Sequence, residues 1–97
     1  MLLGFATYFA TLGATASYPD FDLDDFIVVD SIQAAFQSDV LSTAHPLHQP
    51  NVSSPSDISV LFDIITYDKG ASLLRMTSDF LTETVFTDGL KAYLSAQ

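Results

Sequence analysis

Two histidines, His45 and His48, are the side chains of this chain best suited to ligate a transition metal. They are three positions apart, but Pro46 stands between them and prevents the helical geometry that would bring both imidazoles to one ion. No third ligand is evident near them in the sequence. We therefore expect two loop histidines, one of them bonded to backbone carbonyls, and no metal bound by the pair.

A second candidate metal site is the acidic run that begins at residue 20. Asp20, Asp22 and Asp24 match the first three ligand positions of a calcium-binding loop. The position where that loop needs glycine for its sharp turn holds Asp25, and the position of its bidentate glutamate holds Ser31. The pattern is better explained as the solvated start of a helix, whose dipole favours negative charge.

Asn51 is a candidate site of N-linked glycosylation, because Asn51-Val52-Ser53 is an Asn-x-Ser triplet without proline in the middle. It lies within residues 42–57, which hold three of the four prolines and are predicted to be an exposed connection. An oligosaccharide could be accommodated there. Such triplets also arise by chance, so an unmodified loop asparagine is the alternative.

Tyr67 stands at the predicted N-terminus of a helix, beside Asp68 and Lys69. On spacing alone it is a structural or surface tyrosine. No Ser-His-Asp arrangement can be argued without a fold, and the sequence contains no Gly-rich phosphate loop and no repeat. The residues by themselves therefore indicate an acidic, mostly helical segment without a defined catalytic centre.

The charge balance excludes whole classes of partner. The 97 residues include 12 Asp and Glu but only 3 Lys and Arg, which gives a formal net charge of −9. Nucleic acids and anionic membrane surfaces are bound by basic side chains, so we expect neither of them as a partner. The absence of cysteine excludes disulfides and cysteine-based zinc sites.

Length and hydrophobicity predict one packed domain of marginal stability. With 48% hydrophobic residues and eight phenylalanines, the chain is too apolar for a disordered acidic tail. A compact fold of this mass would expose about 5,400 Å² of surface. Its apolar burial would then roughly balance the conformational entropy that is lost on folding. We therefore expect the free chain to be loosely packed.

The uncharged first 19 residues can be interpreted in three ways. They resemble the apolar part of a secretory signal, with an Ala-x-Ala cleavage mark at Ala14-Thr15-Ala16, but they begin without Lys or Arg. A membrane-spanning helix would have to hide several polar or small residues in about 20 positions. A core helix is the interpretation that we favour, because Gly and Ala allow helices to pack closely.

The spacing of apolar residues predicts an all-α fold without a sheet. We expect helices over residues 4–13, 23–41, 58–65, 67–81 and 84–96. The segment between the second and third of these is the proline-containing connection. The predicted N-caps are Asp22 for the second helix, Ser56 or Asp57 for the third, and Thr66 for the fourth.

Four phenylalanines recur on the apolar faces of these expected helices. The faces that carry Phe26, Phe36, Phe62 and Phe80 are predicted to form the main core. Gly70 lies near the start of its helix, where the missing side chain would allow another element to approach closely. The helix over residues 23–41 is expected to pack against something larger than itself.

Four runs of the chain follow one known pattern in the same order. They are Gly4-Phe5-Ala6-Thr7-Tyr8, Ser42-Thr43-Ala44-His45-Pro46-Leu47, Ile58-x-x-Leu61-Phe62-Asp63-x-Ile65-x-Tyr67-Asp68-Lys69-Gly70-Ala71-Ser72-Leu73-Leu74-Arg75-Met76 and Phe86-x-x-Gly89-Leu90-x-x-Tyr93-Leu94. Over nearly the whole chain they resemble the M1 family of zinc aminopeptidases, the gluzincins that include aminopeptidase N. The resemblance implies that residues 1–97 are the C-terminal helical portion of a thermolysin-like M1 catalytic domain, incomplete here.

The resemblance implies roles for two residues. In the family, an HExxH helix and a Glu of the next helix hold a zinc ion that activates water, and N-terminal residues are removed from peptide substrates. A tyrosine donates its phenol hydrogen to the tetrahedral oxyanion, and the matching residue is Tyr67. Phe62 matches a position that lines the pocket for the side chain of the substrate's N-terminal residue.

The departures from the family pattern concern the zinc ligands. Where the family has Asn-Glu-Gly-Phe, this chain has Leu2-Leu3-Gly4-Phe5, so Leu3 replaces the third ligand. The HExxH motif, and the Gly-Ala-Met-Glu-Asn strand that recognises the free amine, would lie upstream of Met1. We therefore expect the chain alone to bind no zinc and to be inactive, with the upstream catalytic half as its missing partner.

Two interpretations of the product remain open. The chain is either a segment of a metalloaminopeptidase that acts only with the upstream half, or a non-catalytic secreted or dimerising modulator derived from one. By resemblance, many relatives are plasma-membrane or extracellular enzymes with an anchor that would lie outside this chain, whereas others are cytosolic. Asn51, as a glycosylation candidate, favours the plasma-membrane or extracellular location. The match of residues 4–13 to the helix after the zinc ligand favours a buried helix over a signal peptide.

Overall fold

A computed structural model describes residues 2–50, 52–60 and 62–96 of the chain. Its α-helices are α1 (Leu2–Ser17), α2 (Gln33–Asp39), α3 (Pro55–Val60), α4 (Gly70–Leu81) and α5 (Glu83–Ser95). Shorter helical turns are the 3₁₀ segments η1 (Pro19–Phe21) and η2 (Leu23–Asp25) and the π segments η3 (Val28–Ile32) and η4 (Ile65–Lys69). These described ranges contain no strand, which confirms the all-α prediction.

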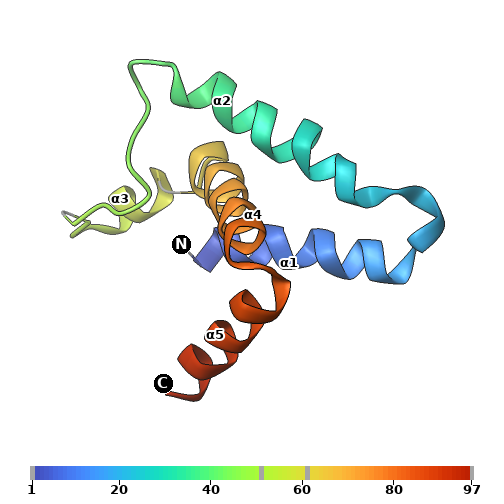
Figure 1. The fold of residues 1–97 in the computed structure, drawn as a ribbon. Helices are drawn as coiled ribbons and strands as arrows, with labels where there is room; N and C mark the ends of the chain where they lie inside the picture. The colour runs from blue at the N-terminus through green and yellow to red at the C-terminus, as the bar shows by residue number, and fades with distance from the viewer. Residues whose placement is uncertain (1, 51, 61, 97) are drawn as a thin grey trace.

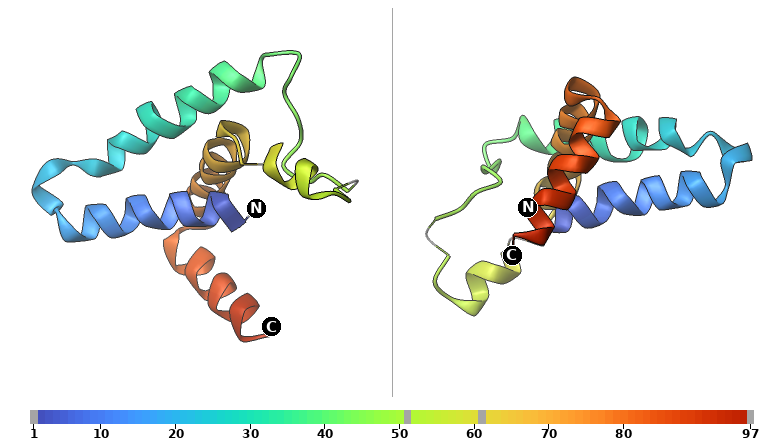
Figure 2. Two further views of the ribbon diagram at one scale, coloured as in Figure 1. Left: turned by 180° about the vertical axis from the view of Figure 1, so that it is seen from behind. Right: turned by 60° about the horizontal axis from the view of Figure 1, so that its bottom comes forward.

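The helices form three rods, two of which diverge as arms while the third lies between them (Figure 1). One arm is α1, and the other is the continuous helix made of η3 and α2, which η1 and η2 connect to α1. The rod of η4 and α4 contacts both arms, and α5 extends from the end of this rod (Figure 2). The turn η4, at the start of the rod, therefore contacts α1 on one side and η3 and α2 on the other.

Two glycines make the closest crossing, between α1 and the start of α4. A Cβ atom added at Gly4 would lie 2.7 Å from the main-chain carbonyl carbon of Gly70, and one added at Gly70 would lie 2.9 Å from the Cα of Gly4. The two backbones can touch only because both residues lack a side chain. The close approach predicted at Gly70 is confirmed, and its partner is Gly4.

The core lies beside this crossing and is small. Its buried members are Tyr8 of α1, Ile27 just before η3, and Ala71 and Leu74 of α4. Phe86 of α5 packs against them, with its ring edge-on to that of Tyr8 and 6.0 Å between the ring centroids. Burial of each large apolar side chain contributes about 1.5–3 kcal/mol, so these few contacts hold the rods together.

The predicted core of phenylalanine faces is wrong. Phe26, Phe36, Phe62 and Phe80 are all exposed, with 58% to 86% of their surface accessible. The interior instead holds other large side chains such as Tyr8 and Ile27, together with small residues such as Ala35 and the crossing glycines. Apolar spacing identifies a face of a helix, but it does not tell which face another element covers.

Helix boundaries differ from the expectation mainly at the ends. The first helix extends beyond the expected range 4–13 on both sides. The helix expected over 23–41 begins with a 3₁₀ turn, contains a π turn and ends at Asp39. The third helix is found at Pro55–Val60 instead of 58–65.

Two predicted caps are also wrong. Asp22 has a left-handed backbone with φ 47° and makes no capping bond. The cap of α3 is Ser54, whose Oγ accepts from the N–H of Asp57 at 3.2 Å, while the Asp57 carboxylate accepts from the N–H of Ser54 at 3.0 Å. This reciprocal pair is a capping box, and Pro55 suits the first helical position that follows it.

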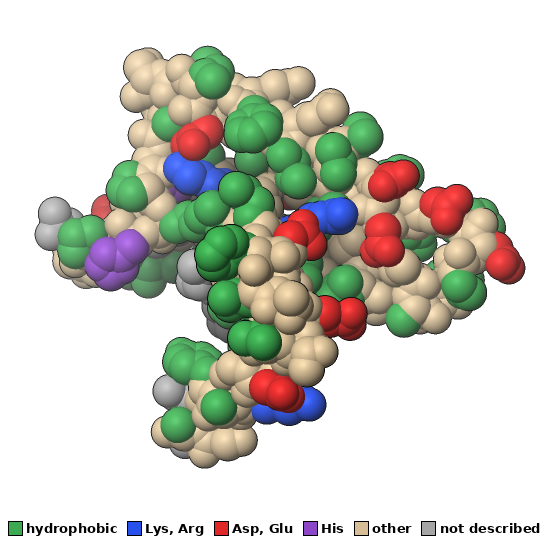
Figure 3. All heavy atoms as spheres, viewed as in Figure 1, with side chains coloured by type: hydrophobic (Ala, Val, Ile, Leu, Met, Phe, Trp, Pro, Cys, Tyr) green, Lys and Arg blue, Asp and Glu red, His purple; other side chains and the backbone are tan. Residues whose placement is uncertain are grey.

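Much apolar surface stays accessible. The accessible area is 6908 Å², above the roughly 5,400 Å² expected of a compact fold of this mass. The radius of gyration, 14.6 Å, likewise exceeds the roughly 12.5 Å of a compact chain of this length. Figure 3 shows hydrophobic side chains exposed along the second arm and the rod, and acidic groups gathered where α1 connects to that arm. None of the helices in the described ranges is long and apolar enough to cross a membrane.

Candidate functional site

Tyr67 lies in η4, the π-helical turn that precedes α4. Tyr67 is half-buried, and its main-chain carbonyl accepts a hydrogen bond from the N–H of Gly70, one of the two crossing glycines. Single π turns of this kind occur frequently at functional sites. Tyr67 is therefore fixed one turn away from the point where α1 and α4 touch.

Asp63 caps this turn. Its Oδ1 accepts from the main-chain N–H of Thr66 at 2.8 Å, and its carbonyl oxygen accepts from the N–H of Tyr67 at 3.1 Å. A carboxylate at this place satisfies an amide that the helix leaves unpaired and complements the helix dipole. The prediction of Thr66 as the cap is wrong, because Thr66 is buried within the turn. Sequence reasoning missed Asp63, although an Asp three residues before such an amide has the usual N-cap spacing.

His45 binds the second oxygen of the Asp63 carboxylate, with 2.6 Å between Nε2 and Oδ2. Its Nδ1 lies 3.0 Å from the carbonyl oxygen of Pro46, which confirms a loop histidine bonded to the backbone. The Pro46 carbonyl and then the Asp63 carboxylate raise the pKa of His45 above 6.5, although burial opposes them. Burial would raise the pKa of Asp63, but the Thr66 N–H and the His45 ring together bring it below 3.8.

Two further side chains of η4 lie near the second arm. The Nζ of Lys69 lies 2.7 Å from Oδ1 of Asp39 at the end of α2. Asp68 lies near η3: burial and the nearby charge of Asp30 raise the pKa of its carboxyl, although Ser31 lowers it. The turn that carries the tyrosine is therefore bonded to the arm as well as capped.

Phe62, the candidate for the substrate side-chain pocket, immediately precedes Asp63 and has 58% of its surface exposed. Two hollows, of about 540 Å³ between α1, α4 and α5 and of about 520 Å³ beside His45, are lined by neither Phe62 nor Tyr67. Leu3 precedes Gly4 and is half-buried. Leu3 thus lies beside one of the crossing glycines, and Tyr67 lies one turn before the other.

The side chains present do not fit a zinc site. Within the described ranges, no three His, Cys, Asp or Glu side chains lie close enough together to hold a metal ion. His45 is paired with Asp63, and His48 is exposed. The side chain of Leu3 offers no atom that can ligate a metal. Asn51, the glycosylation candidate, lies outside the described residues.

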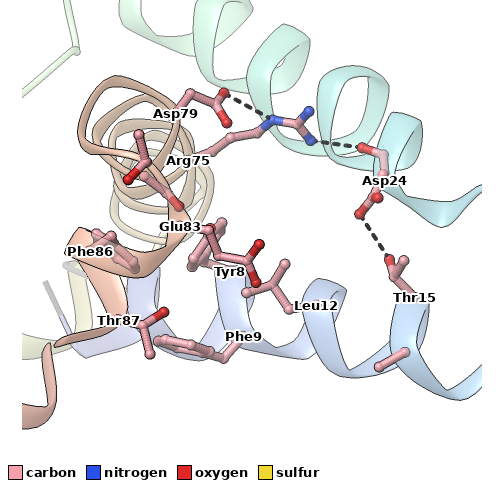
Figure 4. A pocket seen from close by; sticks show the side chains of 13 residues that line it. Tyr8, Phe9, Leu12, Thr15, Asp24, Arg75, Asp79, Glu83, Phe86 and Thr87 are labelled. Atoms are coloured by element: carbon pink, nitrogen blue, oxygen red, sulfur yellow. Dashed lines mark hydrogen bonds and ion pairs between the residues drawn. The ribbon is translucent and has the colours of Figure 1, made fainter.

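A hollow of about 540 Å³ lies between α1, α4 and α5, and Figure 4 shows its lining. Tyr8 and Phe86 contribute aromatic surface to it. At its edge Arg75 joins two elements, because Nη1 donates to the carbonyl oxygen of Asp24 at 2.8 Å and Nε lies 3.7 Å from the carboxylate of Asp79. The bond to Asp24 attaches η2 to α4, whereas the pair with Asp79 lies within α4 at the i,i+4 spacing of a helical ion pair.

The chain matches known proteins along nearly its whole length. The peptidase family M1 domain matches residues 3–97. Aminopeptidase N of Oryctolagus cuniculus is 48% identical over 93 residues, aminopeptidase Ey of Gallus gallus 46% over 93 residues, and aminopeptidase N of Homo sapiens 45% over 93 residues. Each alignment covers 94% of this chain but 10% of the relative. The chain thus spans about a tenth of the length of these curated relatives.

Proposed function

The chain belongs to peptidase family M1, and we propose that it forms the helical segment of a zinc-dependent aminopeptidase that carries the oxyanion donor, Tyr67. The reaction is the removal of N-terminal residues from peptides. The observation that carries the proposal is the attachment of the turn on both sides of Tyr67, by the Asp63 cap before it and by the crossing at Gly70 after it. The described residues of this segment do not fit a zinc site, so the ligands of the metal would come from other parts of the domain.

A tyrosine suits this role because its O–H donates a hydrogen bond without adding a charge to the site. When a nucleophile adds to the scissile carbonyl, negative charge develops on the carbonyl oxygen. A donor already aimed at that position strengthens its hydrogen bond as the charge grows and needs no reorganisation. The capped and anchored turn of Tyr67 supplies such a fixed donor, and the loss of one donor of this kind costs about 3 kcal/mol of transition-state stabilisation.

Phe62 is assigned to the wall of the pocket that receives the side chain of the substrate's N-terminal residue. Its ring is 58% exposed, which leaves it free to contact a ligand. Exposed aromatic rings provide a large apolar contact area at a low entropic cost. The rest of that pocket would come from other parts of the domain.

The test of the catalytic role is a chimera. Residues 3–97 of this chain replace the matching segment of rabbit aminopeptidase N, with Leu3→Glu to supply the family's third ligand. Tyr67→Phe in this chimera should lower kcat by about 10²–10³-fold. KM and zinc content should change little, because the phenol contributes mainly as charge develops on the oxygen. A kcat that is unchanged in Tyr67→Phe removes Tyr67 from the catalytic role.

Tyr93→Phe is the matched control for this test. Tyr93 lies in α5 with 60% of its surface exposed, so the loss of its hydroxyl should leave kcat within a few-fold of the parent. A purely structural tyrosine at position 67 would behave differently from a catalytic one: its replacement would lower the unfolding free energy and leave the kcat of the folded enzyme intact.

A second candidate function is that of a non-catalytic interaction module. The observation that favours it is the exposure of large apolar side chains on two rods, with Phe36 at 68% and Phe80 at 86%. Exposed apolar patches mark surfaces on which another protein packs. Sedimentation of the 97-residue chain tests self-association through these surfaces, and a monomer at high concentration would exclude it.

A further inference from the structure

We propose that His45 and Asp63 form a positioning pair for Tyr67: the Asp63 carboxylate fixes the turn that presents the phenol, and His45 fixes the carboxylate. The inference rests on the proposed function of Tyr67 and adds two residues that act through it. Neither residue needs to touch substrate, because both limit where the turn and its tyrosine can lie.

Three oxygens of Asp63 are engaged at once. Oδ1 accepts from the N–H of Thr66 at 2.8 Å, the carbonyl oxygen accepts from the N–H of Tyr67 at 3.1 Å, and Oδ2 lies 2.6 Å from Nε2 of His45. A carboxylate bonded through both oxygens cannot rotate without losing one bond, and charge-assisted bonds of this length are the strong ones. A displacement of Asp63 therefore reaches Tyr67 through a single main-chain hydrogen bond.

His45 reaches this carboxylate from a separate part of the chain, 18 residues away. Its two ring nitrogens face two acceptors, the Asp63 carboxylate and the carbonyl of Pro46 at 3.0 Å. A neutral imidazole has one N–H, so only the protonated ring donates to both, and the raised pKa of His45 agrees with this geometry. The charge of Lys69 opposes protonation, but Asp39 pairs with that ammonium at 2.7 Å.

The segment around His45 is also packed against the glycine crossing. A Cβ added at Gly70 would lie 3.9 Å from Cδ2 of Leu47, which is two residues after His45 and half-buried. The same segment therefore pairs with the cap of η4 through His45 and lies beside the start of α4 at Leu47. A hollow of about 520 Å³ borders His45 and Asp63, so water can reach a ring whose side chain is only 16% exposed.

A positioning pair and a contact that only stabilises the fold, here called a clasp, should have different effects on the kinetics when they are lost. The loss of a clasp lowers the unfolding free energy and leaves the turnover of the folded enzyme unchanged. The loss of a positioning pair lowers kcat with little change in KM, because a misplaced donor weakens an interaction made mainly in the transition state. The loss of the pair also removes a pH dependence of kcat. In the parent, this dependence arises because the His45 ring releases the proton that it donates to the Pro46 carbonyl as the pH rises through its raised pKa.

The first test uses the 97-residue chain and needs no activity. An NMR titration of the His45 ring should give a pKa above 6.5 that moves down in Asp63→Asn. Asp63→Ala should speed amide hydrogen exchange at Thr66 and Tyr67 by about fivefold to tenfold. His48→Ala, in the same connection, is the control and should leave both amides unchanged. An identical His45 titration in Asp63→Asn, or unchanged exchange at Thr66 in Asp63→Ala, would overturn the pair.

The second test uses the chimera defined above. His45→Ala should lower kcat about tenfold with KM within about twofold, and His45→Gln, whose amide can still donate to Asp63, should recover most of the loss. The kcat of the parent should fall as the pH rises through the raised pKa of His45, and this fall should be absent in His45→Gln. His48→Ala should leave both kcat and its pH profile unchanged.

The two tests separate failure of this inference from failure of the proposed function. If Tyr67→Phe is impaired but His45→Ala keeps the parental kcat and pH profile, Tyr67 remains catalytic and the positioning role of His45 is overturned. If Tyr67→Phe keeps full kcat while NMR finds the bonded pair, the proposed function fails, and the positioning role fails with it although the contact exists.

Discussion

Replacing Gly4 by alanine should force apart the crossing that places Tyr67, and the size of the effect follows from the geometry. The added Cβ would lie 2.7 Å from two main-chain atoms of Gly70 and 3.1 Å from the nitrogen of Ala71. Ordinary contact begins at 3.4 Å, so the two backbones have to separate by about 0.7 Å. No flexible side chain can yield, because all three contacts are with main-chain atoms.

Overpacking costs about 1–3 kcal/mol, and contact with backbone puts Gly4→Ala in the upper part of that range. Alanine gains about 0.5–1 kcal/mol over glycine inside a helix. Gly13→Ala, in the same helix, has nothing within 4 Å of its added Cβ and should show that gain alone. The unfolding free energies of the two variants should therefore move in opposite directions and differ by about 2–3 kcal/mol.

Urea denaturation of the 97-residue chain, followed by circular dichroism at the helix band, gives the direction of both changes as shifts of the transition midpoint. Gly4→Ala should lower the midpoint, and Gly13→Ala should raise it. In the chimera, Gly4→Ala should also lower kcat, because the displaced rod carries Tyr67. Shifts of the same sign and size in the two variants would refute the reasoning, since they would show that the backbones do not touch at Gly4.

The isolated chain should bind zinc no more tightly than about 1 µM and should not cleave amino-acid anilides, because Leu3 cannot ligate a metal. Stoichiometric zinc in a tag-free preparation, lost when both histidines are changed to alanine, would contradict this. Burial raises the pKa of Asp68 in the folded chain, so the unfolded chain loses the carboxyl proton at a lower pH than the folded chain does. Stability should therefore fall as the pH rises from 3.8 to the raised value. Asp68→Asn should remove this fall, and urea midpoints between about pH 4 and pH 7 measure it; an unchanged slope in the variant would be inconsistent with a buried carboxyl. After secretory expression, Asn51→Gln should abolish a glycosidase-sensitive mass shift of the chain, and a wild-type chain without such a shift would remove the candidate. The free chain should unfold over a broad temperature range, and a sharp cooperative melt of a monomer would disprove its loose packing.

The sequence by itself was sufficient to predict which kinds of element make up the fold. Apolar spacing gave an all-α chain, the prolines of residues 42–57 gave the long connection, and Gly70 gave a close approach near the start of a helix. These features depend on neighbours within a few positions, because helical periodicity, caps and breakers act locally. The runs shared with the M1 family likewise identified the domain and the candidate tyrosine without coordinates.

Only the tertiary structure decided which faces are buried and what surrounds Tyr67. Phe36 and Phe80 satisfy every local requirement of a core residue, yet both are exposed, because burial depends on which helices meet. The partner of Gly70 proved to be Gly4 at the other end of the chain, and the partner of the Asp63 cap proved to be His45 across the proline-containing connection. A repeating pattern identifies a face of a helix, whereas a contact between distant residues depends on the path of the whole chain between them.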